Sequence, residues 1–146
     1  MKKIFYIFFL LILFKFSNLY SGEVYIELKI ENEIITNFDI EKEEKYLLAL
    51  NNNLTQIPKK QLYELSKNSI VNEKIKKKEL LRYFDLEKAD IIMKDVTKNF
   101  YNKLGFKNEN QFSSYLNQHQ ININYVKEKL KIETLWNQLV YNKFNN

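Results

Sequence analysis

The side chains best suited to chemistry in this sequence are four carboxylates close together, Asp39, Glu41, Glu43 and Glu44. Clustered carboxylates can act as general acids and bases or bind metal ions. Here they occupy the first turns of a predicted helix, where acidic residues are usually solvated and interact with the positive end of the helix dipole. No histidine lies near them in the sequence. We therefore expect a solvated helix start and no catalytic or metal site.

The sole histidine, His119, lies between two glutamines, and there is no cysteine. A catalytic triad would need a nucleophile and an orienting acid, and no recognisable motif supplies them. One histidine without cysteine cannot provide the three or four nitrogen and sulfur ligands that zinc usually takes. The two glycines are isolated, so there is no phosphate-binding loop. We expect no enzyme activity, no metal and no cofactor.

Aromatic residues are a second group with functional potential, because an aromatic groove can bind extended polypeptide segments. The candidates for peptide binding are Phe100, Tyr101, Phe106, Phe112 and Tyr115. A domain of this size buries its aromatic side chains first, so most of the five should belong to the core and one or two should border a groove. Trp136 is interpreted as a core residue.

The N-terminus has the pattern of an export signal. Met1-Lys2-Lys3 is a short cationic head, and an unbroken apolar run follows from Ile4 to Phe14. This run is shorter than the roughly 20 residues of a spanning helix and matches the apolar region of a secretory signal. We expect a signal peptide over residues 1–21, cleavage after Ser21, and one exported domain over residues 22–146. An uncleaved membrane anchor is the alternative.

Removal of residues 1–21 would take away Lys2, Lys3 and Lys15 and no acidic residue, so the formal net charge would fall from +5 to +2. Nucleic-acid binding draws on a clustered excess of basic residues, and Arg82 is the only arginine. We expect no nucleic-acid partner. The run Lys76-Lys77-Lys78 is interpreted as the solvated edge of a helix.

The longest predicted element is a central helix from Pro58 to Phe84, with a capping hydroxyl available from Thr55. Its apolar residues fall on two sides of the helix, which predicts neighbours on both. One side carries Leu62, Leu65, Ile70, Leu80, Leu81, Tyr83 and Phe84, and the other carries Val71 and Ile75.

Before the central helix, residues 24–30 alternate as a half-buried strand, Glu31-Asn32-Glu33 turns the chain, and Ile34-Ile35 returns it. Thr36 and Asp39 form a capping box for a helix from Asn37 to about Leu50, with Phe38, Leu47 and Leu50 inward. After the central helix, helices are predicted over residues 86–104, 109–118 and 122–144, with Gly105 and Asn108 as caps. The fold class is mostly α: several helices around one long central helix, with a short N-terminal β-hairpin.

Two segments carry a family resemblance. The run from Glu31 to Asp39, followed about thirty residues later by the run from Ser69 to Ile75, resembles the N-terminal domain of SurA-type periplasmic chaperones. Members of that family open with a strand, an asparagine-containing turn, a short return and a helix capped by Thr or Ser with Asp three residues later. The likeness covers about residues 24–144.

The resemblance implies an ATP-independent holdase in the periplasm, assisting the folding of outer-membrane proteins by binding their unfolded segments rich in aromatic residues. The family usually continues into parvulin-type prolyl isomerase domains, which residues 1–146 do not include, so isomerase activity is not expected. Two alternatives stay open. The chain could be the non-catalytic N-terminal part of a truncated peptidyl-prolyl cis-trans isomerase, or a membrane-tethered helical adaptor.

The predicted first strand offers a second binding surface. In the family, a C-terminal segment completes this part of the domain, and residues 1–146 lack that segment. An unpaired strand edge invites another strand, so Val24, Ile26 and Leu28 are expected to mark an edge that self-associates or captures an extended polypeptide.

Overall fold

The computed structural model describes residues 22–144, except for the side chains of residues 91 and 92. The elements, in chain order, are β1 (Ile26–Ile30), β2 (Glu33–Thr36), α2 (Asn37–Leu50), the 3-10 helix η2 (Asn52–Gln56), α3 (Lys59–Leu80), α4 (Asp90–Lys103), α5 (Glu109–Gln118) and α6 (Ile123–Phe144). The predicted fold class, mostly helical with an N-terminal hairpin, is confirmed. The predicted signal peptide and its cleavage after Ser21 lie outside the described residues. Within them, no helix is long and apolar enough to cross a membrane.

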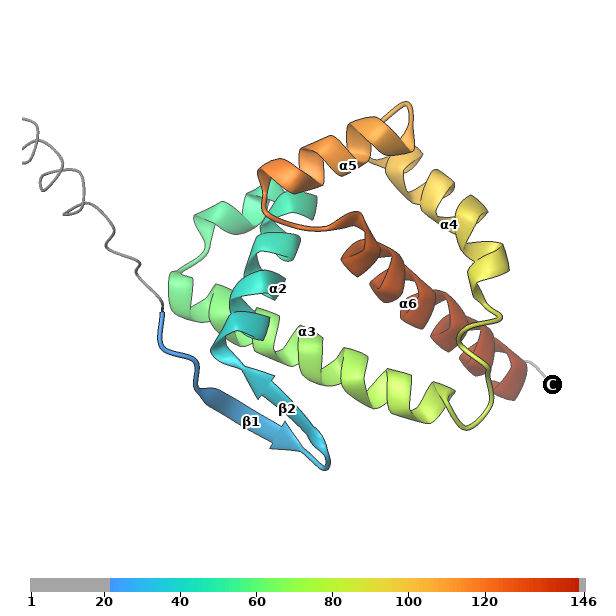
Figure 1. The fold of residues 1–146 in the computed structure, drawn as a ribbon, viewed down its shortest axis with the longest axis horizontal. Coiled ribbons are helices and arrows are strands. Elements are labelled where there is room, and N and C mark those ends of the chain that lie inside the picture. The colour runs from blue at the N-terminus through green and yellow to red at the C-terminus, as the bar shows by residue number, and fades with distance from the viewer. Residues whose placement is uncertain (1–21, 145–146) are drawn as a thin grey trace, which may run out of the picture.

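Helix α3 is the central element, as predicted (Figure 1). On one side its Ile70 packs against Ile35 of the hairpin and Ile40 of α2. Near its C-terminal end, Leu80 packs against three buried residues of α6, namely Ile132, Leu135 and Leu139. Both Ile70 and Leu80 belong to the first of the two predicted apolar sides. On the second side Val71 packs against the same hairpin cluster as Ile70, whereas Ile75 is 52% exposed, so the predicted neighbours on that side are only partly present.

The predicted bounds of α3 are wrong at its C-terminal end, because regular helix stops at Leu80 and not at Phe84. The backbone amide of Phe84 donates to the carbonyl of Leu80 (2.8 Å), which closes a turn. This turn brings Phe84 and Leu86 against the same cluster of α6 residues that Leu80 contacts. Because residues 81–89 turn and loop in this way, α4 begins at Asp90, after the predicted start at Leu86.

Several side chains that were predicted to face inward on the central helix are exposed. These side chains are Leu65, Leu81 and Tyr83. Nor is the predicted cap of Thr55 formed at the start of α3. Its hydroxyl instead donates to the carbonyl of Asn52 (2.7 Å), inside the short 3-10 helix.

Three other helix ends follow the sequence signals. The amide of Asp39 donates to the hydroxyl of Thr36 (3.3 Å), and the amide of Thr36 donates to the carboxylate of Asp39 (2.8 Å), which completes the capping box of α2. The amide of Gln111 donates to the side chain of Asn108 (2.9 Å) at the start of α5. Gly105 has a φ of +88°, the left-handed conformation in which glycine commonly ends a helix.

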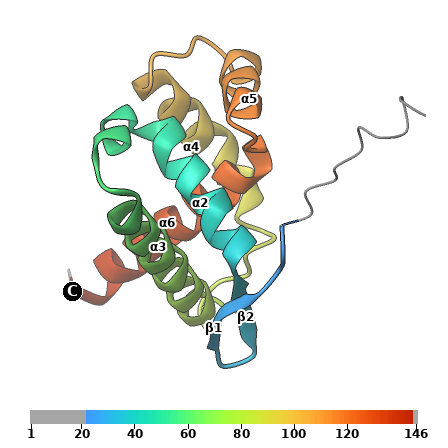
Figure 2. The same cartoon turned by 90° about the vertical axis from the view of Figure 1, so that its left-hand side faces the viewer.

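Helices α4, α5 and α6 form the part of the molecule that contains the end opposite the hairpin. Figure 2 shows the hairpin and α5 at opposite ends. The core of this part is a cluster of five buried side chains, Tyr101, Phe112, Leu116, Ile121 and Val126. Partly buried residues of α2, Tyr46 and Leu50, pack against it and join the two ends of the fold.

Candidate functional site

The five aromatic candidates for peptide binding come together in the structure. Phe112 is completely buried and Tyr101 is nearly so, while Phe100, Phe106 and Tyr115 pack against them and are partly buried. The ring of Phe112 lies 5.2 Å from that of Phe106 and 6.0 Å from that of Phe100, measured between centroids. Contacts at these distances are those of a packed aromatic core. The main role of these five aromatic side chains is therefore to hold α4, α5 and α6 together, and peptide binding could involve only those that reach the surface.

Two of the five border an open hollow on the surface of α5. Phe106 and Tyr115 line it together with polar residues of the same helix, namely Asn110, Gln111, Ser114 and Gln118. The hydroxyl of Tyr115 donates to the backbone carbonyl of Ala49 (2.7 Å), which fixes the ring against α2. His119 lies against this ring, with 4.7 Å between the centroids. The hollow thus has a fixed aromatic floor and a polar rim.

The hairpin carries a second candidate surface, on its outer face. Val24 is 64% exposed and Ile26 is 62% exposed, and Ile34 and Phe38 are exposed as well. Leu28, which was predicted with Val24 and Ile26 as part of the strand edge, instead faces inward and packs against the cluster of Ile35 and Ile70. We call Val24, Ile26, Ile34 and Phe38 the outer hairpin patch.

Phe38 corrects a prediction, because it was expected to face the core. The buried residues of α2 include Ile40 and Glu43. At about 100° per residue, Phe38 lies roughly 200° from Ile40 and therefore points away from the core. It is exposed in the first turn of α2, which directly follows the hairpin.

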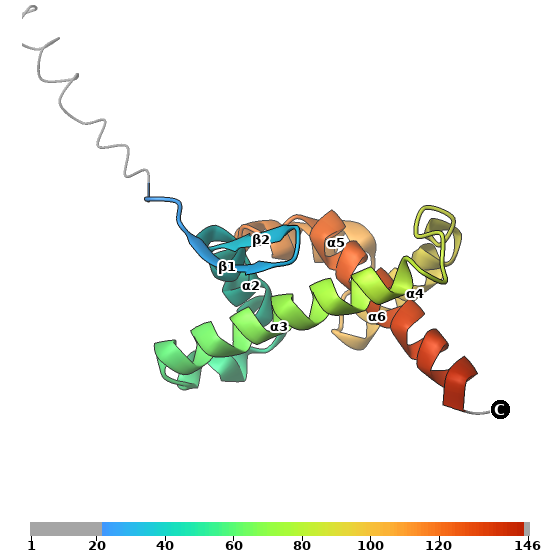
Figure 3. The same cartoon turned by 90° about the horizontal axis from the view of Figure 1, so that it is seen from below.

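The hairpin is a two-stranded antiparallel sheet, so among residues 22–144 each strand pairs with one other strand. The register pairs Leu28 with Ile35 and Ile30 with Glu33, and a bulge lies between Ile26 and Leu28. Just before β1, Tyr25 remains tied to α2, because its amide donates to the side chain of Asn37 (3.0 Å). Figure 3 shows the hairpin lying along one side of α3. Backbone groups on the outer edges of the sheet are thus available to an added strand.

The acidic residues predicted to be solvated include one that is completely buried. Glu43 of α2 has no exposed surface and accepts three polar contacts. One carboxylate oxygen accepts from the hydroxyl of Ser69 on α3 (2.6 Å). The other accepts from the hydroxyl of Tyr125 (2.6 Å) and the ammonium of Lys129 (2.8 Å), both on α6. The prediction of a solvated carboxylate is wrong for Glu43, because its partners come from two distant helices.

The surroundings of Glu43 favour a structural role over catalysis. Lys129 also pairs with Glu73 of α3, so the buried ammonium is shared between two carboxylates. Burial, with the nearby negative charge of Glu43, raises the pKa of Tyr125, and burial does the same for Tyr46. Ser69 donates to a carboxylate that could act as a base, yet both oxygens of Glu43 are already bound. We call Glu43, Ser69, Glu73, Tyr125 and Lys129 the buried ionic cluster.

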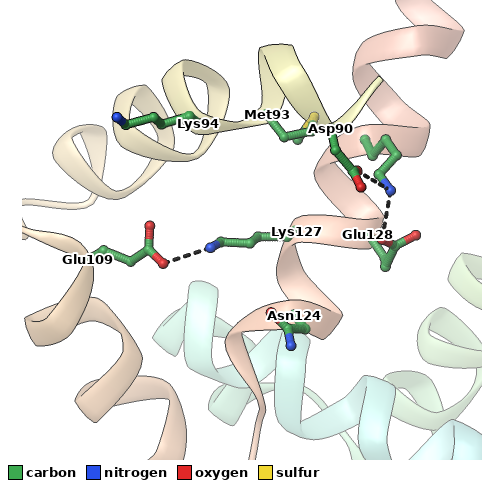
Figure 4. A pocket seen from close by; sticks show the side chains of 8 residues that line it. Asp90, Met93, Lys94, Glu109, Asn124, Lys127 and Glu128 are labelled. Atoms are coloured by element: carbon green, nitrogen blue, oxygen red, sulfur yellow. Dashed lines mark hydrogen bonds and ion pairs between the residues drawn. The ribbon is translucent and has the colours of Figure 1, made fainter. Parts of the chain in front are cut away.

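A cavity of about 330 Å³ lies between α4, α5 and α6 (Figure 4). Most of its charged side chains form ion pairs, either across the helices or within α6. Lys131 of α6 contacts Asp90 of α4 (2.6 Å) and Glu128 (2.8 Å), and Lys127 contacts Glu109 of α5 (2.6 Å). These pairs neutralise most of the charge in the cavity, so it offers no strong preference for an anion or a cation.

Within residues 22–144, no group of three or more histidine, cysteine or acidic side chains is arranged to hold a metal ion. No protein-family model matches the chain, and the searches of curated proteins and of solved structures found no match either. The resemblance to SurA-type chaperones therefore stays an expectation from the sequence.

Proposed function

We propose that this protein is an ATP-independent holdase that binds extended, unfolded polypeptide segments through its hairpin. The observation that carries this proposal is the outer hairpin patch together with the open edges of the two-stranded sheet. Four exposed apolar side chains lie in or next to the strands of the hairpin, whose backbone can also form hydrogen bonds with a ligand. That combination suits an extended chain better than a folded surface or a small molecule.

The physical basis is strand addition. A polypeptide that adds to a sheet edge is held mainly by backbone hydrogen bonds, which do not depend on its sequence. Apolar contacts with Val24, Ile26 and Ile34 would then favour segments with large apolar or aromatic side chains. Exposed apolar groups of this kind also mark interaction sites in general. Broad specificity of this type is what a holdase needs.

The family resemblance suggests which polypeptides would be bound. It points to unfolded outer-membrane proteins in the periplasm, which the expected signal peptide would allow the protein to reach. The resemblance also suggests binding without nucleotide, in keeping with the lack of a phosphate-binding loop in the sequence. The two alternatives from the sequence, part of a prolyl isomerase and a membrane-tethered adaptor, are compatible with the same hairpin surface.

The proposal can be tested by light scattering from an unfolded β-barrel protein diluted out of denaturant. We expect the wild-type chain to suppress aggregation when present in several-fold excess. Ile26→Ser combined with Ile34→Ser should weaken suppression, because it removes apolar contacts on the outer face and leaves the inward residues in place. Ile26→Pro tests the strand edge separately, since proline lacks a backbone donor and disrupts ladder pairing.

Leu65→Ser is the matched control, because Leu65 is an exposed apolar residue of α3 outside the outer hairpin patch. This variant should suppress aggregation as well as the wild type does. Circular dichroism of each variant would establish that the helices are intact. No suppression by the wild type, or equal suppression by the hairpin variants and the wild type, would contradict the proposal.

A further inference from the structure

The open hollow on α5 has a polar rim but no charged residue in its lining. The lining residues are Phe106, Asn110, Gln111, Ser114, Tyr115 and Gln118. The hollow measures about 460 Å³, which is within the range of small-molecule sites. Figure 1 shows α5 along one edge of the molecule, where a dissolved ligand can reach it. The hollow is therefore a second candidate site, on a different element from the outer hairpin patch.

The lack of charge in this region extends along the sequence. No aspartate, glutamate, lysine or arginine occurs from residue 110 to residue 126, although 28% of the residues of the chain are charged. Seven of these 17 residues are asparagine or glutamine. The exposed side of a helix usually carries charged residues as well as polar ones. On α5 the exposed residues are all neutral, namely Asn110, Gln111, Ser114, Asn117 and Gln118.

The aromatic floor of the hollow is fixed in place. The ring of Tyr115 lies 5.1 Å from the ring of Phe106 and 4.7 Å from the ring of His119, measured between centroids. The hydrogen bond from the hydroxyl of Tyr115 to the carbonyl of Ala49 (2.7 Å) further restricts its ring. A site that is ordered before the ligand arrives loses little conformational freedom on binding.

Two amide side chains of the rim are free to bind a ligand. The side-chain oxygen of Gln111 already accepts from the backbone amide of Lys107 (3.1 Å). Within residues 22–144, by contrast, the side chains of Asn110 and Gln118 are exposed and have no hydrogen-bond partner. Each of these amides can both donate and accept hydrogen bonds.

The chemistry of the lining excludes several classes of ligand. A phosphate or carboxylate group would find no cation there, and a cation would find no carboxylate. An alkyl chain would cover the amides without giving them hydrogen bonds. A ligand with hydroxyl groups satisfies both kinds of lining residue, because hydroxyls pair with amides and an adjoining apolar face can pack on the aromatic rings.

We propose that the hollow binds a neutral sugar. The C–H face of a sugar ring would pack on Phe106 and Tyr115, and its hydroxyl groups would form hydrogen bonds with Asn110 and Gln118. An extended polypeptide fits this site less well, because the backbone groups of a helix are bonded within the helix and offer no strand edge. The hollow therefore suits a compact ligand.

NMR titration of the isotope-labelled chain with two neutral oligosaccharides, chitotriose and maltotriose, tests the proposal. At least one of them should cause saturable shifts of the backbone amides of residues 106–119, with a Kd below about 5 mM. The amides of the hairpin should not shift. The aromatic rings should also shift the resonances of the sugar C–H groups that pack on them.

Asn110→Ala combined with Gln118→Ala removes the two free amides and should weaken sugar binding at least about fivefold. The matched control is Asn99→Ala combined with Asn102→Ala, which removes two exposed amides of α4 that do not line the hollow. This control should bind the sugar as the wild type does. All four residues are exposed and lie in helices, so the substitutions should preserve the fold, and circular dichroism would check this.

Several results would overturn the proposal. They are the absence of saturable shifts with either sugar up to about 50 mM, and equal affinities of the wild type and the variant without the two amides. Shifts of the α5 amides with an unfolded β-barrel client but with neither sugar would also overturn it, and would assign the hollow to a polypeptide. Ile26→Ser combined with Ile34→Ser should bind the sugar as the wild type does, so failure of the holdase proposal and failure of this one are distinguishable.

Discussion

The ammonium of Lys129 on α6 lies 2.8 Å from a carboxylate oxygen of Glu43 on α2, and both side chains are almost completely buried. Ser69 of α3 donates to the same carboxylate, so one ionic group contacts three helices. A buried ion pair need not stabilise a protein relative to an apolar packing, because removing two charges from water is costly. It does penalise any packing that separates the partners. The buried ionic cluster thus fixes how α6 lies against α2 and α3.

Loss of one partner of this pair should destabilise the fold strongly. Lys129→Met leaves Glu43 buried with neutral partners only, and we expect the free energy of unfolding to fall by about 3–5 kcal/mol. Glu43→Gln combined with Lys129→Met removes both charges and should recover part of this loss. Urea unfolding of Lys129→Met, of Glu43→Gln and of the double variant gives the coupling energy between the two side chains. Additive effects of the two substitutions would show that the pair does not act as a unit.

Alkaline pH should destabilise the protein through Tyr46 and Tyr125. Burial raises the pKa of both phenols, and the negative charge of Glu43 adds to the effect. Above about pH 10 the unfolded chain loses these protons while the folded chain keeps them, so the free energy of unfolding falls as pH rises. Each tyrosine should contribute about 1.4 kcal/mol per pH unit in that range.

Tyr125→Phe should make the fall of the free energy of unfolding with pH less steep, because only Tyr46 of the two tyrosines would then contribute to it. Urea unfolding at several pH values above 9 would measure the slope, and tyrosinate absorbance would show whether buried phenols ionise only on unfolding. Equal slopes for the variant and the wild type would contradict the assignment of Tyr125.

The capping box of α2 predicts a difference between two threonines, the partly buried Thr36 and the exposed Thr55. Thr36→Ala removes the hydroxyl that accepts from the amide of Asp39, and it should lower the free energy of unfolding by about 1 kcal/mol. Thr55→Ala removes a hydroxyl that caps no α-helix and should have less than half that effect. Thermal unfolding of the two variants side by side makes the comparison, and equal losses would argue against the cap.

Thr97 of α4 offers a stabilising substitution. Its side chain is completely buried, and within the described part of the chain its hydroxyl has no hydrogen-bond partner. A buried hydroxyl without a partner loses its hydration and gains nothing in return. Thr97→Val keeps the shape of the side chain and should raise the free energy of unfolding by about 1 kcal/mol. Urea unfolding would test this, and a destabilised variant would indicate that the hydroxyl has a partner after all.

The sequence signals that proved reliable are local ones. Thr36 with Asp39, Asn108 and Gly105 each determine a helix end through contacts within a few residues, and all three ends were predicted. The alternation of residues 24–30 likewise predicted the hairpin, although regular pairing begins at Ile26. Hydrogen bonds between residues close in the sequence determine these helix ends and the hairpin, so they can be predicted from the sequence alone.

The features that the sequence did not predict depend on residues far apart in the chain. Glu43 is buried because Ser69, Tyr125 and Lys129 reach it from other helices, and no pattern within α2 signals that. The turn after Leu80 likewise depends on the α6 residues that Leu86 contacts. The candidate binding residues were predicted in part, since Val24 and Ile26 are exposed while Leu28 and most of the aromatic group belong to the core.

Amide hydrogen exchange of the protein, with and without an unfolded β-barrel client, tests the central claim most directly. Strand addition would protect backbone amides, so residues 24–36 should exchange more slowly when the client is present, while exchange in the helical core should not change. Unchanged exchange in the hairpin under conditions where the client is bound, or protection confined to the hollow beside Phe106 and Tyr115, would contradict the claim that the hairpin is the client-binding surface.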